Sequence, residues 1–161
     1  KRAQAPEEVI AKLERVAWQA RMLVSRPRPM RALPSSPLAL LQEASARLRV
    51  KDKGGAIAAY DRLAADTGVD TLWRDLARLL AVMQRMDSAA PDELDRQLAP
   101  LVADGNPWRF TARELAATVR LKAGDRNGAR EGFRRVADDA QAPAGVRARA
   151  AEILAALGEG G

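Results

Sequence analysis

The chain has 161 residues, 47% of them apolar, and a formal net charge of +6, which is enough chain to bury one hydrophobic core or a short row of stacked units. It contains no cysteine and no histidine, which excludes disulfides, Cys/His and Ser/His/Asp catalysis, and imidazole-based zinc sites. With 4% aromatic and 30% charged residues, and many alanines, the composition favours helix over sheet. We therefore expect an all-α protein without catalytic residues, metal or cofactor.

The positive charge is concentrated near the N-terminus. Residues 1–50 carry ten Lys or Arg against four acidic residues, whereas residues 51–161 carry 17 of each sign. The arginine-rich stretch RMLVSRPRPMR contains no aromatic residue that could stack on a base. We therefore expect a membrane surface or an acidic protein as its neighbour rather than nucleic acid.

Residues 1–35 are predicted to form a basic helix followed by a linker. Apolar residues recur at helical spacing from Val9 to Ala20, which predicts a helix over residues 6–24. The stretch SRPRPMRALPSS that follows contains three prolines, and each disfavours helical backbone in the residue before it. It is predicted to be a Pro/Arg-rich linker to a helical domain over residues 36–161.

Apolar spacing and proline positions predict seven further helices in that domain. Proline is tolerated at the first helical position, where its missing N–H would be unpaired anyway, and Ser36 and Asn106 are predicted as N-caps. The helices are expected over residues 37–50, 54–66, 71–87, 91–103, 107–123, 126–140 and 143–157. The short connections between them predict antiparallel helical hairpins.

Two stretches of the chain are nearly the same. VKDKGGAIAAYDRLAAD, residues 50–66, is followed 73 positions later by AGDRNGAREGFRRVADD, residues 123–139. Between them, Leu94, Leu98 and Leu101 supply an apolar stripe of helical period. Such an echo predicts helix-turn-helix repeats of roughly 34 to 37 residues, of which the middle copy has diverged in sequence.

These stretches resemble tetratricopeptide repeats. In that family the second helix carries a small residue, a large aromatic residue four positions later and an aliphatic residue three positions further. Here the order is matched by Ala56, Tyr60 and Leu63, and again by Ala129, Phe133 and Val136. The resemblance implies an α-solenoid of about three helical hairpins with residues 143–157 as a capping helix, in which the small residue lets the helices of a hairpin approach closely.

A narrower resemblance covers residues 38–158, including AIAAYDRLAADTGVDTLWRDLARLL and KAGDRNGAREGFRRVADD. This part is similar to the bacterial YfgM-like group, ancillary subunits of the SecYEG translocon. The resemblance implies a periplasmic scaffold or chaperone-like module on the inner membrane, with translocon subunits, periplasmic chaperones or clients as partners. The N-terminal membrane anchor of that group is not in this sequence, because no apolar run is long enough, and we expect it to be missing.

Two alternatives remain open. The first is a cytoplasmic adaptor of tetratricopeptide type whose basic N-terminal region recruits an acidic partner. The second is an enzyme that relies on carboxylates, which would require a pair of Asp or Glu side chains to converge in a pocket. As to assembly, an exposed end repeat favours a homodimer.

In a stack of this kind, polar side chains of the first helix of each hairpin form the default binding surface, the concave face. Placed on the predicted helices, the residues expected on that face are Gln42, Ser45, Arg49, Asp75, Arg78, Arg85, Thr111, Glu114, Thr118 and Lys122. Trp73 and Trp108 are expected to pack against the ends of neighbouring hairpins rather than to bind a ligand.

Overall fold

The computed structural model describes residues 36–158, and within this range the chain forms seven α-helices and no strand. The prediction of an all-α protein is therefore confirmed for this part of the chain. The helices are α2 (Pro37–Arg49), α3 (Lys53–Ala65), α4 (Thr71–Arg85), α5 (Pro91–Leu98), α6 (Arg109–Lys122), α7 (Arg126–Asp138) and α8 (Ala144–Leu157). The helix and linker predicted within residues 1–35 lie outside the described residues.

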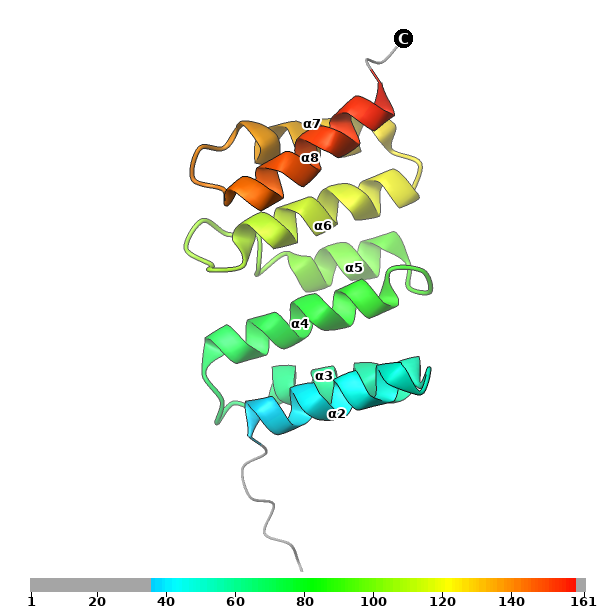
Figure 1. Cartoon of the computed structure of the whole chain (residues 1–161), viewed down its shortest axis with the longest axis vertical. Helices are drawn as coiled ribbons and strands as arrows, with labels where there is room; N and C mark the ends of the chain where they lie inside the picture. The colour runs from blue at the N-terminus through cyan, green and yellow to red at the C-terminus, as the bar shows by residue number, and fades with distance from the viewer. Residues whose placement is uncertain (1–35, 159–161) are drawn as a thin grey trace, which may run out of the picture. The chain divides into compact units, whose positions relative to one another are not determined.

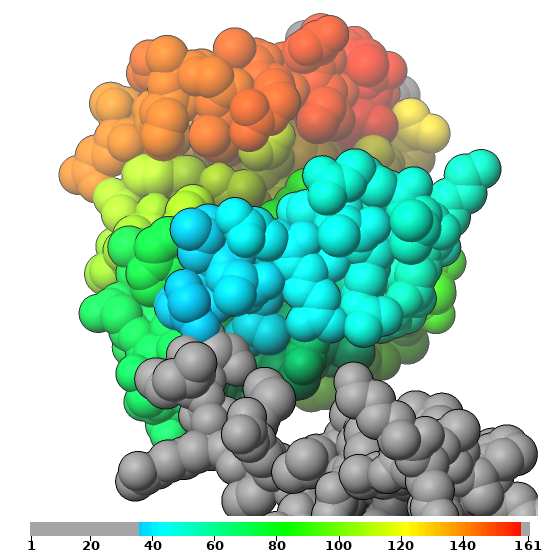
Figure 2. All heavy atoms as spheres, turned by 60° about the horizontal axis from the view of Figure 1, so that its bottom comes forward, coloured from blue at the N-terminus to red at the C-terminus, as the bar shows by residue number. Residues whose placement is uncertain are grey.

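The helices follow one another as hairpins arranged in two layers (Figure 1). α2, α4, α6 and α8 succeed one another in the layer nearer the viewer, the front layer, and α3, α5 and α7 form the rear layer. Neighbours along the chain pack together, from α2 with α3 to α7 with α8, and α6 also contacts α8. The end of this row that α2 and α3 form is seen in space-filling view in Figure 2.

Three apolar clusters form the core, and each joins three consecutive helices. The first lies among α2, α3 and α4 and includes Tyr60 and Leu63. The second lies among α4, α5 and α6 around Leu98, and the third lies among α6, α7 and α8 around Phe133. Because α4 and α6 each contribute to two clusters, the stability of one hairpin depends on the next.

The repetition at 73 residues has a structural counterpart in α3 and α7, which are both 13 residues long. The Asp52 carboxylate caps α3 by accepting a hydrogen bond from the backbone N–H of Gly55 at 2.8 Å. Asp125 caps α7 in the same way, with Gly128 as donor at 2.8 Å. The residues that match between the two helices are buried in both: Ala56, Tyr60, Leu63, Ala129, Phe133 and Val136. The echo in sequence therefore corresponds to two helices with the same cap and the same buried side.

α5 is shorter than predicted: it ends at Leu98, whereas the prediction extends it to residue 103. Pro100 has no N–H with which to continue the helical hydrogen bonds. The predicted apolar stripe of this segment is nevertheless buried, including Leu94 and Leu101. The chain after Leu98 thus stays in the core without remaining helical.

α6 begins at Arg109, two residues later than the start predicted from Pro107. Contrary to the prediction, Asn106 does not cap the helix. Its Oδ1 accepts a hydrogen bond from the backbone N–H of Trp108 at 2.8 Å, which forms a turn before the helix. Its Nδ2 donates to Asp75 Oδ2 at 2.8 Å, so the turn is tied to α4.

Candidate partner-binding face

The residues predicted on α2 are all exposed, as expected for a binding surface. These are Gln42, Ser45 and Arg49. Their spacing of three and four residues places them along one side of the helix. This side remains a predicted contact surface.

On α6, three of the four predicted residues are accessible at least in part. Thr111 and Thr118 are half-buried, and Lys122 is exposed. The Thr118 hydroxyl donates to the backbone carbonyl of Glu114 at 2.9 Å, and Lys122 forms an ion pair with Asp87 at the end of α4. The Lys122 ammonium holds the pKa of the Asp87 carboxyl below its ordinary value.

Glu114 was also expected to be exposed, but it is buried and already paired. Its two carboxylate oxygens accept hydrogen bonds from Nε and Nη2 of Arg149 at 2.9 and 2.8 Å. The pair joins α6 to α8, and the carboxylate raises the pKa of Arg149. Glu114 therefore connects two helices of the fold.

On α4, the three predicted residues do not lie on the exposed side of the helix. Asp75 is only 5% exposed, and its carboxylate accepts from Arg78 Nη1 at 2.7 Å and from Asn106 Nδ2 at 2.8 Å. Arg78 and Arg85 line a groove with residues of α3 and α5, and Arg85 donates to Asp61 of α3 at 3.0 Å. Arg78 and Arg85 thus face the rear layer, and Asp75 is buried. No buried side-chain polar atom in residues 36–158 lacks a hydrogen-bond partner.

The exposed side of α4 is apolar. Three large apolar residues of α4 recur at intervals of four and seven positions: Leu72, Leu76 and Met83. They therefore lie along one side of the helix, opposite the arginines that face α3. Leu72 is 43% exposed and Met83 is 46% exposed, whereas Leu76 is half-buried; on α2, Leu38 is 57% exposed. We call Leu72, Leu76 and Met83 the apolar stripe; it lies on the outer side of the front layer. A row of exposed large apolar side chains is typical of a protein-binding surface.

The two tryptophans beside this surface behave differently. Trp108 packs against the second cluster, as predicted, and its Nε1 donates to the backbone carbonyl of Leu72 at 3.1 Å. Trp73 is 39% exposed, so the prediction that it packs against the end of a hairpin is only partly met. It adds aromatic surface next to the stripe.

Sequence reasoning missed the apolar stripe although its spacing was readable. α4 carries apolar residues on two sides, and the buried side includes Ala77 and Ala81. The prediction places polar residues on the outer side, because a helix with one buried side normally exposes polar groups. A second apolar period at positions 72, 76 and 83 was the signal that would have found it.

Residues 36–158 contain no group of three acidic side chains arranged to hold a metal ion. None of the helices α2 to α8 is long and apolar enough to cross a membrane. Comparison of the chain with family models, with curated proteins and with solved structures gives no match.

Proposed function

We propose that residues 36–161 form a tetratricopeptide-like α-solenoid that binds other proteins and performs no chemistry itself. Three hairpins followed by α8 fit this proposal, and so does the matching of α3 with α7 in capping and burial. The lack of cysteine and histidine is consistent with a binding role, because the commonest catalytic groups are not available to the chain.

The observation that carries the proposal is the apolar stripe on α4. Leu72 and Met83 are exposed on this helix, and α2 of the same layer exposes the polar residues Gln42 and Ser45. An apolar centre with a polar rim is the usual composition of a protein interface. A partner helix with one apolar side would bury the stripe without leaving polar groups unpaired.

For the location, we propose the periplasmic side of the bacterial inner membrane, with translocon subunits, envelope chaperones or their clients as partners. This part of the proposal derives from the resemblance to the YfgM-like group.

The test is site-specific photo-crosslinking in cells that express the full-length protein. A photoreactive amino acid at Ser45 or Met83 should form adducts with envelope proteins, whereas the same residue at Arg134, exposed on α7 in the rear layer, should not. Met83→Glu should abolish the adduct formed from Ser45 while leaving the helical circular dichroism unchanged. Equal adducts from both layers would contradict a binding surface on the front layer.

A cytoplasmic adaptor is the second candidate, favoured by the ten basic residues among residues 1–50. In that case the adducts would be acidic cytoplasmic proteins, and deleting residues 1–35 would abolish them. Adducts between two copies of the chain would instead indicate a homodimer.

A further inference from the structure

A groove of about 690 Å³ opens between α5 and α7 and has α6 as its base. The α6 residues that line it include Ala116, Ala117 and Arg120, on the side that faces the rear layer. It is therefore separate from the apolar stripe. Its size is in the range of pockets that hold small molecules.

The base of the groove is apolar, and so is part of each wall. Ala117 and Gly132 meet so closely that a Cβ added to the glycine would lie 2.8 Å from that of Ala117. The apolar part of the walls is formed by Leu98, Val102 and Val136. Because the base consists of small residues and α5 is only eight residues long, side chains leave this space unfilled.

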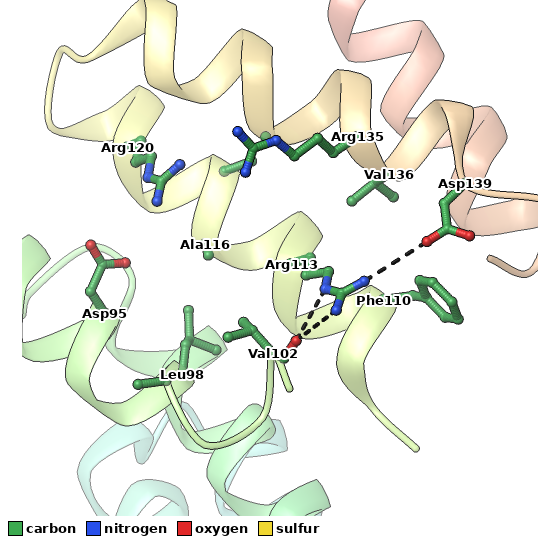
Figure 3. A pocket seen from close by; sticks show the side chains of 13 residues that line it. Asp95, Leu98, Val102, Phe110, Arg113, Ala116, Arg120, Arg135, Val136 and Asp139 are labelled. Atoms are coloured by element: carbon green, nitrogen blue, oxygen red, sulfur yellow. Dashed lines mark hydrogen bonds and ion pairs between the residues drawn. The ribbon is translucent and has the colours of Figure 1, made fainter. Parts of the chain in front are cut away.

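One end of the groove is closed by Arg113 (Figure 3). Its guanidinium donates to the backbone carbonyl of Val102 through Nε at 3.1 Å and through Nη2 at 2.9 Å. Its Nη1 lies 3.8 Å from Asp139 Oδ2. Val102 and Asp139 belong to opposite walls, so Arg113 spans the groove. A chain-like ligand would have to end here.

The other end carries two further arginines, Arg120 of α6 and Arg135 of α7 (Figure 3). Within residues 36–158 the Arg120 side chain makes no hydrogen bond or ion pair. Arg135 uses Nε to donate to Glu131 Oε1 at 2.9 Å, which leaves both terminal NH₂ groups for another acceptor. Two guanidinium groups at the mouth of an apolar groove favour an anionic head group.

A similar groove between α3 and α5 shows what an arginine in this position does when an acid reaches it. There Arg85 of α4 is bound by Asp61 at 3.0 Å. In the groove above α6, Asp95 of α5 lies on the wall but makes no ion pair with Arg120. The Arg120 guanidinium is therefore free for a ligand, and the Asp95 carboxylate on the wall would repel an anion bound nearby.

We infer that this groove binds a small molecule with an apolar body and one terminal carboxylate, of the size of a medium-chain fatty acid. The apolar body lies over Ala116, Ala117 and Gly132 and ends at Arg113. The carboxylate lies at the mouth and accepts hydrogen bonds from Arg120 and Arg135. This ligand site is independent of the partner-binding face proposed on the front layer.

Titration of the isotopically labelled chain with octanoate, observed by amide NMR, tests the inference. Octanoate should bind saturably and shift the amides of Ala116, Ala117 and Gly132. Octan-1-ol, which has the same body without charge, should bind roughly tenfold more weakly, because it cannot accept two charge-assisted hydrogen bonds. Acetate, which has the charge without the body, should produce no saturable shift.

Variants separate the contributions of charge and shape. Arg120→Gln should weaken octanoate binding roughly tenfold, and Arg134→Gln, an equal change of charge outside the groove, should not alter it. Asp95→Asn should tighten binding several-fold, because it removes a negative charge that repels the bound carboxylate. Ala116→Leu should fill the groove and prevent binding of octanoate and octan-1-ol alike.

Three results would overturn the inference. One is a set of octanoate-induced shifts that do not saturate or that scatter over the surface. Another is octan-1-ol binding as tightly as octanoate. The third is equal affinity in Arg120→Gln and Arg134→Gln, which would leave only a non-specific effect of charge.

Discussion

At the scale of single residues, the turn before α3 and the turn before α7 have the same backbone but different residues. Lys51 has φ of 61°, and its counterpart Gly124 has φ of 86°. Both donate their N–H to a carbonyl three residues earlier, Lys51 to Leu48 at 3.0 Å and Gly124 to Leu121 at 3.1 Å. Positive φ costs a residue with a Cβ roughly 1–2 kcal/mol, whereas glycine adopts it readily.

Replacing Lys51 with glycine should therefore stabilise the protein. The relief of strain exceeds the entropy that glycine adds to the unfolded chain, and we expect a net gain of about 0.5–1 kcal/mol. Val50→Gly is the control, because Val50 is also exposed and has a negative φ of −93°. Urea denaturation measures the free energy of unfolding of both variants. If Lys51→Gly is no more stable than Val50→Gly, the backbone of Lys51 is not strained.

Gly132 is required for the close approach of α7 to α6. A Cβ at this position would lie 2.8 Å from Ala117 Cβ, so Gly132→Ala should cost roughly 1–2 kcal/mol even though alanine is the better helix former. Gly54→Ala places the same methyl group where the nearest other atom is 4.0 Å away, and it should stabilise α3. If thermal unfolding shows that both variants are stabilised, the hairpin can separate at little cost.

At the scale of elements, the connection between α5 and α6 is held by polar contacts to α4. Asp75 accepts from Asn106 in this connection, and Trp108 donates to the Leu72 carbonyl. Asp75 thus joins α4 to a segment about thirty residues further along the chain. Asp75 is buried, and its hydrogen bonds explain why α4 carries a polar residue at this position.

Asp75→Ala should destabilise the protein by about 1–3 kcal/mol, because it removes the acceptor of two partners in a buried position. Asp61→Ala, which removes an exposed partner of Arg85, should cost less than about 1 kcal/mol. Chemical denaturation compares the two variants, and hydrogen exchange should show faster opening of residues 99–108 in Asp75→Ala only. Equal costs would mean that burial adds nothing to the Asp75 contacts.

At the scale of the whole molecule, acid should weaken the described fold. Hydrogen bonds from Arg62 hold the pKa of Glu43 below its ordinary value of 4.5. The backbone N–H that Asp52 caps lowers the pKa of Asp52 from 3.8, and Lys122 lowers the pKa of Asp87 from 3.8. A carboxyl with a lower pKa in the folded state stabilises the fold above its ordinary pKa, and that contribution is lost as pH falls through the folded pKa.

The melting temperature should accordingly be nearly constant from about pH 8 to 5, because the chain has no histidine, and it should fall from about pH 4.5 downward. Circular dichroism melts at a series of pH values measure this dependence. Glu43→Gln should reduce the fall. A melting temperature that is unchanged down to pH 3 would exclude a contribution from these carboxylates.

Much of the fold could be predicted from the chain because its signals are local. The aspartate caps and the spacing of Ala56, Tyr60 and Leu63 depend only on residues within a few positions of one another. Their recurrence 73 residues later made the correspondence of α3 and α7 readable. Helix ends were less predictable, as α5 shows, because local proline chemistry competes there with the apolar pattern.

The sequence alone determined that this protein is helical, roughly where its helices lie and which residues of α3 and α7 are buried. Only the tertiary structure decided which side of α4 is exposed, because that helix is apolar on two sides and its periodicity is satisfied by either. The α5–α7 groove likewise required the structure, since it arises from a short helix and small residues on separate segments. Local periodicity places a residue on a side of its helix, but contacts between helices decide what that side meets.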